Sequence, residues 1–230
     1  MAAYDLEEQE QLAEIKTWWK QYGNLVTGIV VAASLGVLAW QGWNWYQRNQ
    51  SAQASAIYSV LQRAALERDT QKTKAAAGEL VEKFGRTVYA PLGALTAAKA
   101  LFDAGDVKSA KAQLAWVTEN AADEMRDLAR VRLATVQLDE QAYDDALKTL
   151  SASHGQSFEL RFAELKGDVF AAQGKKAESA AAYKAALARL DGEGKDAKNQ
   201  STLQMRGANA PYREMLQQKL DSLGHAGEGK

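Results

Sequence analysis

The longest apolar stretch of the sequence lies near its N-terminus. No charged residue occurs between Lys20 and Arg48, and residues 25–46 would span about 33 Å as a helix, close to the thickness of a bilayer's hydrocarbon core. Tryptophan and tyrosine prefer the membrane interface, and here they bracket the stretch. They are Trp18, Trp19 and Tyr22 before it and Trp40, Trp43, Trp45 and Tyr46 at its end. The pattern predicts a transmembrane anchor at residues 23–47.

A cleaved signal peptide and a buried core helix are the alternatives to an anchor. A signal peptide would begin with basic residues and end in a cleavage site of small residues. Here residues 1–20 carry five acidic and two basic side chains, and the end of the apolar stretch contains three tryptophans. A core helix has no reason to carry aromatic rings at both ends. We therefore expect an uncleaved anchor behind a short acidic cytoplasmic tail at residues 1–22. Lys16 and Lys20 precede the span and only Arg48 follows it closely, so charge favours this orientation only slightly.

Small residues recur every four positions within the predicted span. Gly28, Ala32 and Gly36 would lie along one face of the helix, where small side chains let a second membrane helix approach closely. Small residues are common in membrane helices in any case, so the sequence leaves open whether this stripe packs against a specific partner helix.

The rest of the chain has a helical pattern that repeats itself. The segments 95–117, 131–153 and 164–186 align with spacings of 36 and 33 residues. Four columns stand out in this alignment. A small residue in a first helix is followed seven positions later by a turn residue, five further by a small residue in a second helix, and four further by an apolar one. The columns hold Ala98, Ala134 and Gly167; Gly105, Gln141 and Gly174; Ala110, Ala146 and Ser179; and Leu114, Leu150 and Tyr183.

This spacing resembles the tetratricopeptide repeat, a helical hairpin of about 34 residues that stacks into a solenoid. We expect an all-α chain in which a single N-terminal transmembrane helix precedes a tetratricopeptide-like solenoid at residues 48–190. A leading helical pair is predicted at residues 49–68 and 70–84. A polar, flexible linker is expected at 191–210, because that stretch is rich in glycine and charge. Pro211 would then open a capping C-terminal helix at 211–224, and residues 225–230 would be a disordered tail.

The sequence offers little for catalysis. It contains no cysteine, and its two histidines, His154 and His225, stand in a predicted loop and tail without partners at metal-ligand spacing. No serine lies in a nucleophile elbow. Residues 48–230 carry 26 basic and 24 acidic side chains, which is not the concentrated basic charge that nucleic-acid binding needs. We expect no enzyme activity, cofactor, metal, nucleic-acid ligand or small-molecule substrate.

Stacked hairpins bind partners through the groove lined by their first helices. The resemblance to the tetratricopeptide repeat implies that three sets of residues line this groove. Several of the leucines among them could equally be core between helices. The first set is Leu92, Leu95, Lys99 and Phe102, the second is Leu128, Val131, Thr135 and Leu138, and the third is Arg161, Glu164, Asp168 and Ala171.

Taken together, these features resemble the ancillary SecYEG translocon subunit family (YfgM-like). The features are the acidic tail, the span ending in "WQGWNWYQRNQ", the degenerate repeats and the closing "PYREMLQQKL". The resemblance implies a single-pass protein of the bacterial inner membrane with its solenoid in the periplasm. It also implies as partners the SecYEG translocon, the membrane-anchored foldase PpiD and exported unfolded clients, with a role in handing exported proteins to periplasmic chaperones.

Two other functions stay open at this stage. The chain could be a general cell-envelope scaffold that assembles another membrane complex without touching unfolded chains. It could also be a regulator whose solenoid faces the cytoplasm. Crosslinking to nascent exported protein distinguishes the translocon role from the envelope scaffold. Membrane topology decides whether the solenoid faces the cytoplasm, as the regulator requires.

Overall fold

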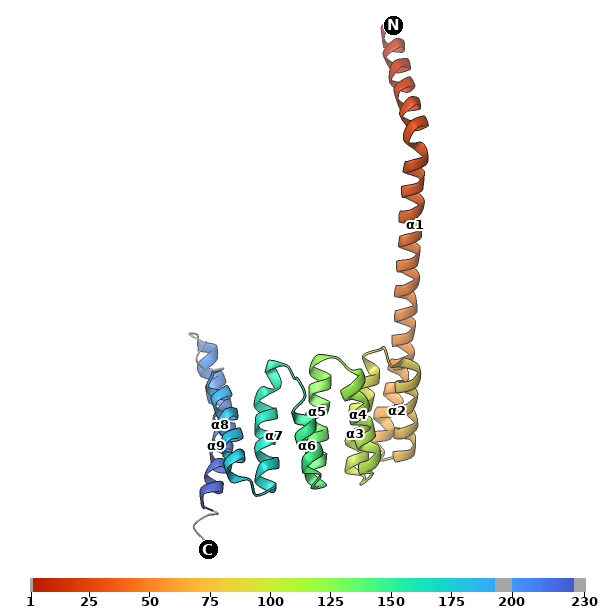
Figure 1. Cartoon of the computed structure of the whole chain (residues 1–230). Coiled ribbons are helices and arrows are strands. Elements are labelled where there is room, and N and C mark those ends of the chain that lie inside the picture. Colours follow the sequence, from red (N-terminus) through yellow and green to blue (C-terminus); the bar gives the residue numbers. More distant parts are fainter. Residues whose placement is uncertain (1, 193–199, 226–230) are drawn as a thin grey trace. The chain divides into compact units, whose positions relative to one another are not determined.

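The computed structural model describes residues 2–192 and 200–225, with the side chains of residues 12–13, 15–192 and 209–224. These residues form helices and no strand, which confirms the all-α prediction. The chain divides into two compact units, one up to Gln53 and one from Ala54 on. The helices, labelled in Figure 1, are α1 (Ala2–Leu66), α2 (Thr70–Phe84), α3 (Tyr89–Asp103), α4 (Val107–Asn120), α5 (Asp123–Asp139), α6 (Tyr143–Leu150), the 3-10 helix η1 (Gln156–Phe158), α7 (Glu159–Ala172), α8 (Lys176–Gly192) and α9 (Gln200–His225).

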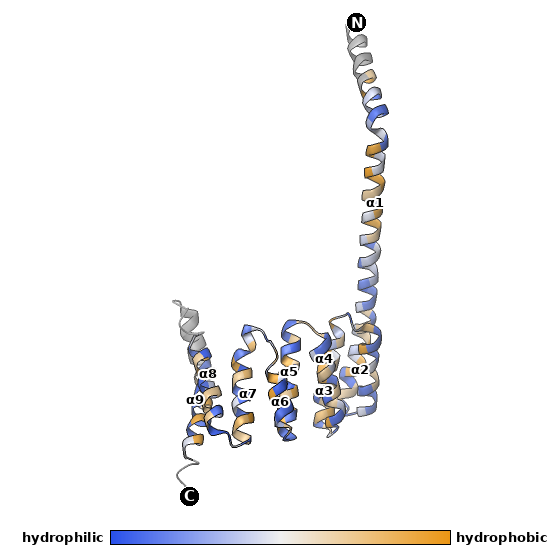
Figure 2. Cartoon of the chain, in the orientation of Figure 1, coloured by the Kyte–Doolittle hydropathy of each residue, from blue (hydrophilic) through white to orange (hydrophobic). Residues whose placement is uncertain are grey.

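The first unit consists of the N-terminal part of α1. Within α1, Ile15–Leu66 includes a stretch long and apolar enough to cross a membrane. Figure 2 shows hydrophobic residues along the middle of this helix. Leu25, Leu38 and Trp40 are all more than 60% exposed. A helix that carries large apolar side chains exposed on several sides is typical of a span surrounded by lipid.

The second unit is a row of helical hairpins. From α2 to α9, each helix packs against its neighbours in chain order, as Figure 1 shows. The end of α1, from Ala54 on, pairs with α2, and the next pairs are α3 with α4, α5 with α6, and α7 with α8. One apolar cluster joins α1 to α4 through Leu61, Leu80, Leu101 and Ala110. Each hairpin therefore buries its apolar face against the next, as in a solenoid.

The same turn closes all four hairpins. Arg68, Gly105, Gln141 and Gly174 have φ angles of 58°, 84°, 61° and 75°. At the second turn, the Gly105 N–H donates to the Phe102 carbonyl at 2.9 Å and the Asp106 N–H to the Leu101 carbonyl at 2.8 Å. The corresponding two bonds recur in the other three turns, and this pair defines the Schellman helix ending. The predicted turn column is confirmed, and the leading helical pair is a further hairpin in register with it.

The small-residue columns lie where the two helices of a hairpin cross. Ala98, Ala134 and Gly167 are buried in the first helices. In the second helices Ala110, Ala146 and Ser179 are fully buried. Ser179 departs from alanine because its hydroxyl donates to the Gly167 carbonyl at 2.8 Å. The prediction that these columns mark close crossings is confirmed in the fourth hairpin, and the burial of all six residues agrees with it in the others.

The C-terminal part differs from the sequence-based expectation. Helix α8 continues through Gly192 and α9 begins at Gln200, so both ends of the linker expected at 191–210 are helical, while residues 193–199 lie outside the described residues. Pro211 lies inside α9 and does not open it. Proline holds φ near the helical value and removes one hydrogen bond, and Tyr212, Met215 and Leu216 just after it pack against α8. Of the predicted tail, residues 226–230 lie outside the described residues.

Candidate binding surfaces

The residues predicted to line the solenoid groove divide into two groups in the structure. Leu95 and Leu128 belong to the apolar cluster between the second and third hairpins, and Val131 and Leu138 to the cluster between the third and fourth. Leu92 is half-buried. Because the first four pack in or against the protein's own core and Leu92 is partly covered, these five side chains offer little surface to a partner.

Lys99, Phe102 and Thr135 do meet at a surface cavity. It has a volume of about 250 Å³ and lies between α3 and α5, with Leu114 and Val136 in its lining. Phe102 is 37% exposed and is the largest apolar side chain in the lining. Lys99 is held by Asp103 of the same helix at 2.7 Å. This cavity, which we call the helix groove, is the part of the predicted groove that remains accessible.

The charged third set holds α9 in place. Lys219 Nζ of α9 lies 3.0 Å from Glu164 Oε1 and 2.8 Å from Asp168 Oδ1. The Tyr212 hydroxyl donates to Glu164, which also accepts from Arg161 at 3.0 Å. Ala171 is half-buried. The column that leaves Lys99, Phe102 and Thr135 accessible in the second and third hairpins thus forms an internal interface in the fourth, and α9 covers the end of the solenoid as expected.

Burial and charge pairing act in opposite directions on this network. Burial raises the pKa of Glu164, but the hydrogen bonds from Tyr212 and Lys219 outweigh it and leave the pKa below its usual value. Burial lowers the pKa of Lys219, and its bonds to Asp168 and Glu164 bring it above the usual value. Burial, with the hydrogen bond to Glu164, raises the pKa of Tyr212 to about 12. At neutral pH the Glu164 carboxylate and the Lys219 ammonium group are therefore charged and paired.

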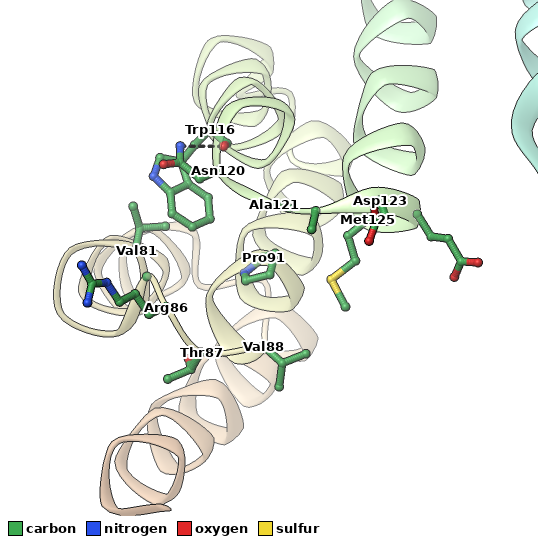
Figure 3. A pocket seen from close by; sticks show the side chains of 13 residues that line it. Val81, Arg86, Thr87, Val88, Pro91, Trp116, Asn120, Ala121, Asp123 and Met125 are labelled. Carbon is green, nitrogen blue, oxygen red and sulfur yellow. Dashed lines mark hydrogen bonds between the residues drawn. The ribbon is translucent and has the colours of Figure 1, made fainter. Parts of the chain in front are cut away.

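A larger pocket lies where the loops between hairpins gather. Its volume is about 940 Å³, and its lining comes from the end of α2, the start of α3, the end of α4 and the start of α5. Figure 3 shows Val81, Val88, Pro91, Trp116 and Met125 around this space, which we call the loop pocket. Val88 is 53% exposed. The pocket thus presents an apolar surface that the solenoid itself does not cover.

The charges of the loop pocket stand on opposite sides of it. Figure 3 shows Arg86 beside α2 and Asp123 at the start of α5, next to Met125. Glu124 also lines the α5 side. Asp123 has a φ of 46°, in the left-handed region where aspartate is among the better tolerated residues. Among the residues that the structure describes, none of these three charges makes an ion pair.

Sequence reasoning missed the loop pocket because its lining is spread over residues 81–125 and lies outside the repeat columns. Two signals could have pointed to it. Trp116 is the only tryptophan outside the N-terminal segment, and Val88 is an apolar residue in a loop just before Pro91.

The predicted membrane stripe is accessible. Gly28, Ala32 and Gly36 are exposed on α1, and a Cβ atom added to Gly28 or Gly36 would meet no other atom within 4 Å. Packing against a partner helix stays a prediction.

Signs of catalysis are no stronger in the structure than in the sequence. Among the described residues, no group of three or more metal-ligating side chains comes together. The His154 ring stacks on Phe162 with centroids 4.0 Å apart, and its Nδ1 lies 3.0 Å from the Ala152 carbonyl oxygen. These contacts are those of a packing residue. The side chain of His225 lies outside the described residues.

Fold and surfaces together define a helical-hairpin repeat protein with one apolar N-terminal helix. The family model described as a tetratricopeptide repeat-like domain matches residues 16–225. Three curated relatives are each named ancillary SecYEG translocon subunit. The Haemophilus influenzae protein is 33% identical over 76% of this chain and 85% of its own length. The Neisseria gonorrhoeae protein is 31% identical over 97% and 100%, and the Escherichia coli protein 27% over 78% and 87%. The chain therefore belongs to the tetratricopeptide repeat-like domain family and, within it, to the ancillary SecYEG translocon subunit proteins.

Proposed function

We propose that this protein is a membrane-anchored adaptor of the Sec translocon, with its N-terminus in the cytoplasm and its solenoid in the periplasm. The observation that carries the proposal is the match to the Neisseria gonorrhoeae relative, which spans 97% of this chain and 100% of that protein. The likeness thus includes both the apolar helix and the hairpins, and the relative is named for the translocon.

The proposed mechanism is binding and not catalysis. An anchored solenoid stays near the channel exit, and confinement of this kind raises the effective concentration of a binding surface. Weak contacts through the helix groove or the loop pocket then suffice to hold PpiD or an exported unfolded client until a periplasmic chaperone takes it. Phe102 and Val88, exposed by 37% and 53%, are the apolar side chains that such contacts would use.

Topology is the first test. Intact cells carrying a tag at Lys230 are treated with protease before and after the outer membrane is permeabilised. Loss of the tagged domain only after permeabilisation is the expected result. Protection of the domain until the inner membrane is broken would place the solenoid in the cytoplasm and overturn the proposal.

The small-residue stripe gives a second test. Replacing Gly28 and Gly36 with isoleucine should abolish co-purification with SecYEG or PpiD from mild detergent, because bulky side chains keep two helices apart. Replacing Ser34 with isoleucine is the matched control, since Ser34 is a small exposed residue on another face of the same helix. Equal recovery of both partners with all variants would remove the stripe from the mechanism.

A general envelope scaffold is the alternative proposal. It would have the same topology but would assemble another membrane complex and would not contact unfolded chains. Site-specific photocrosslinking from position 102 or 88 during export separates the two, because only the translocon adaptor should form adducts with nascent exported proteins.

A further inference from the structure

The loop pocket has the features of a peptide-binding site. Its volume of about 940 Å³ is near the upper end of the range for ligand sites, about 300–1,000 Å³. The Val88 side chain at its rim is 53% exposed. Small-molecule sites hold polar groups that converge inside the pocket, whereas the charges here stand apart on two sides (Figure 3). A chain segment, which can meet both sides at once, fits this layout better.

The two sides differ in charge. The α5 side carries Asp123 and Glu124, and the α2 side carries Arg86. Acidic residues in the first turn of a helix stabilise the helix by themselves, so their presence alone indicates no ligand. Helix stabilisation does not explain why an apolar surface, beginning with Met125, lies beside the two acids. It also does not explain why Arg86 lies across the pocket from them. The lining as a whole has an excess of one negative charge among the residues that the structure describes.

We infer that the loop pocket binds a segment of another polypeptide in which a large apolar side chain stands next to a lysine or arginine. The apolar side chain contacts Val88, Pro91 and Met125, and the cation of the segment faces Asp123 and Glu124. Arg86 donates hydrogen bonds to a carboxylate or a backbone carbonyl of the same segment, because a guanidinium group has only donors. The inference concerns the second unit alone and does not depend on the translocon or on membrane orientation.

Fluorescence anisotropy with two labelled peptides tests the inference, using the full chain in lipid nanodiscs. The probes are GSKFLKSG and its charge-reversed partner GSEFLESG. The lysine peptide should bind about tenfold more tightly than the glutamate peptide, because two charge pairs are involved. Replacing Asp123 and Glu124 with lysine should invert this preference. The control changes Asp144 and Asp145 to lysine, since these are two exposed acids in the first turn of α6.

A second pair of variants tests the apolar contact. Val88→Asp should weaken binding of the lysine peptide about tenfold, since it places a charge where an apolar side chain should lie. Val60→Asp is the matched control, because Val60 is exposed to a similar extent, 57%, on α1. Equal affinity for both peptides, no binding of either, or equal effects at positions 60 and 88 would overturn the inference. A dimer that Val88→Asp dissociates would also overturn it, because the occupant would then be a second copy of this chain.

Discussion

The ring of Tyr183 fills the space that any side chain at position 167 would need. A Cβ atom placed on Gly167 would lie 2.4 Å from Cε1 of Tyr183. The tyrosine cannot easily move aside, because it is 3% exposed and its hydroxyl donates to Asp168 Oδ1 at 2.7 Å. The fourth hairpin is therefore built on the absence of a side chain at Gly167.

Gly167→Ala should destabilise the solenoid by about 2 kcal/mol, because the added methyl group overpacks the crossing of α7 and α8. Gly78→Ala is the matched control. Gly78 is also helical, and a Cβ atom there would meet nothing within 4 Å, so alanine should stabilise the protein by up to roughly 1 kcal/mol. Thermal unfolding followed by circular dichroism measures both. Equal midpoints for the two variants would contradict the close crossing.

The left-handed conformation of the hairpin turns predicts that Gln141→Gly stabilises the protein and that Gly105→Ala destabilises it. Gln141 has a φ of 61°, a conformation that costs an L-residue about 1 kcal/mol or more, so Gln141→Gly should stabilise the protein by about that amount. Gly105 has a φ of 84°, so its replacement by alanine should lower the free energy of unfolding by about 1 kcal/mol. Urea denaturation curves of the two variants give the comparison. A loss of stability with Gln141→Gly would show that its side chain has a role beyond the turn.

The interface of α9 should respond to acid. Because the pKa of Glu164 in the folded protein lies below the ordinary value of 4.5, its contribution is complete above pH 4.5 and is lost as pH falls through the lower, folded value. We expect hydrogen exchange of α9 amides to accelerate as the pH falls through the pKa of Glu164 in the folded protein, while α3 amides stay protected. Glu164→Gln should accelerate exchange already at pH 7 and respond less to acid. If α3 and α9 lose protection together, the network does not act locally.

Lys219→Met should weaken the attachment of α9 at neutral pH. It leaves Glu164 and Asp168 without their shared cation, at a cost of about 1–2 kcal/mol. Lys184→Met, an exposed lysine on α8, is the control. Hydrogen exchange should show faster opening of α9 only in the first variant, and identical exchange in the two variants would exclude a stabilising role for this contact.

The groove residues divide into tolerant and intolerant positions. Phe102→Asp should lower the free energy of unfolding by only about 1 kcal/mol, since 37% of the residue's surface is already exposed. Leu138→Asp should cost about 3 kcal/mol, because Leu138 packs in the core of the third and fourth hairpins. Denaturation measurements check this difference, and only the Phe102 variant is then suitable for testing client binding. Similar tolerance at both positions would mean that Leu138 belongs to the surface.

The repeat was predictable because a close helix crossing requires small residues at fixed spacing. In the first hairpin, Arg68 stands at the position where the turn column of two other hairpins has glycine. The Schellman ending requires a left-handed residue and two hydrogen bonds, and Arg68 and Gln141 supply both without being glycine. A search for glycine therefore finds only two of these four turns.

The candidate site was less predictable because it depends on which surfaces the chain itself covers. Column positions mark the inner face of each first helix, but they do not show that Leu95 and Leu138 pack in the core or that Lys219 binds Glu164 and Asp168. Those contacts join residues tens of positions apart. The loop pocket is of the same kind, since Val88 lies just before α3 and Met125 lies in the first turn of α5.

The locally closed turns have a consequence for how such proteins change in evolution. Each hairpin satisfies its turn N–H groups with its own carbonyls, so the gain or loss of one complete hairpin leaves the turns of the other hairpins paired. An insertion of one or two residues within a helix, by contrast, would rotate the later residues of that helix away from their crossing. Length variation among related solenoids should accordingly come in whole-hairpin steps or in the loops between hairpins, and rarely inside a helix.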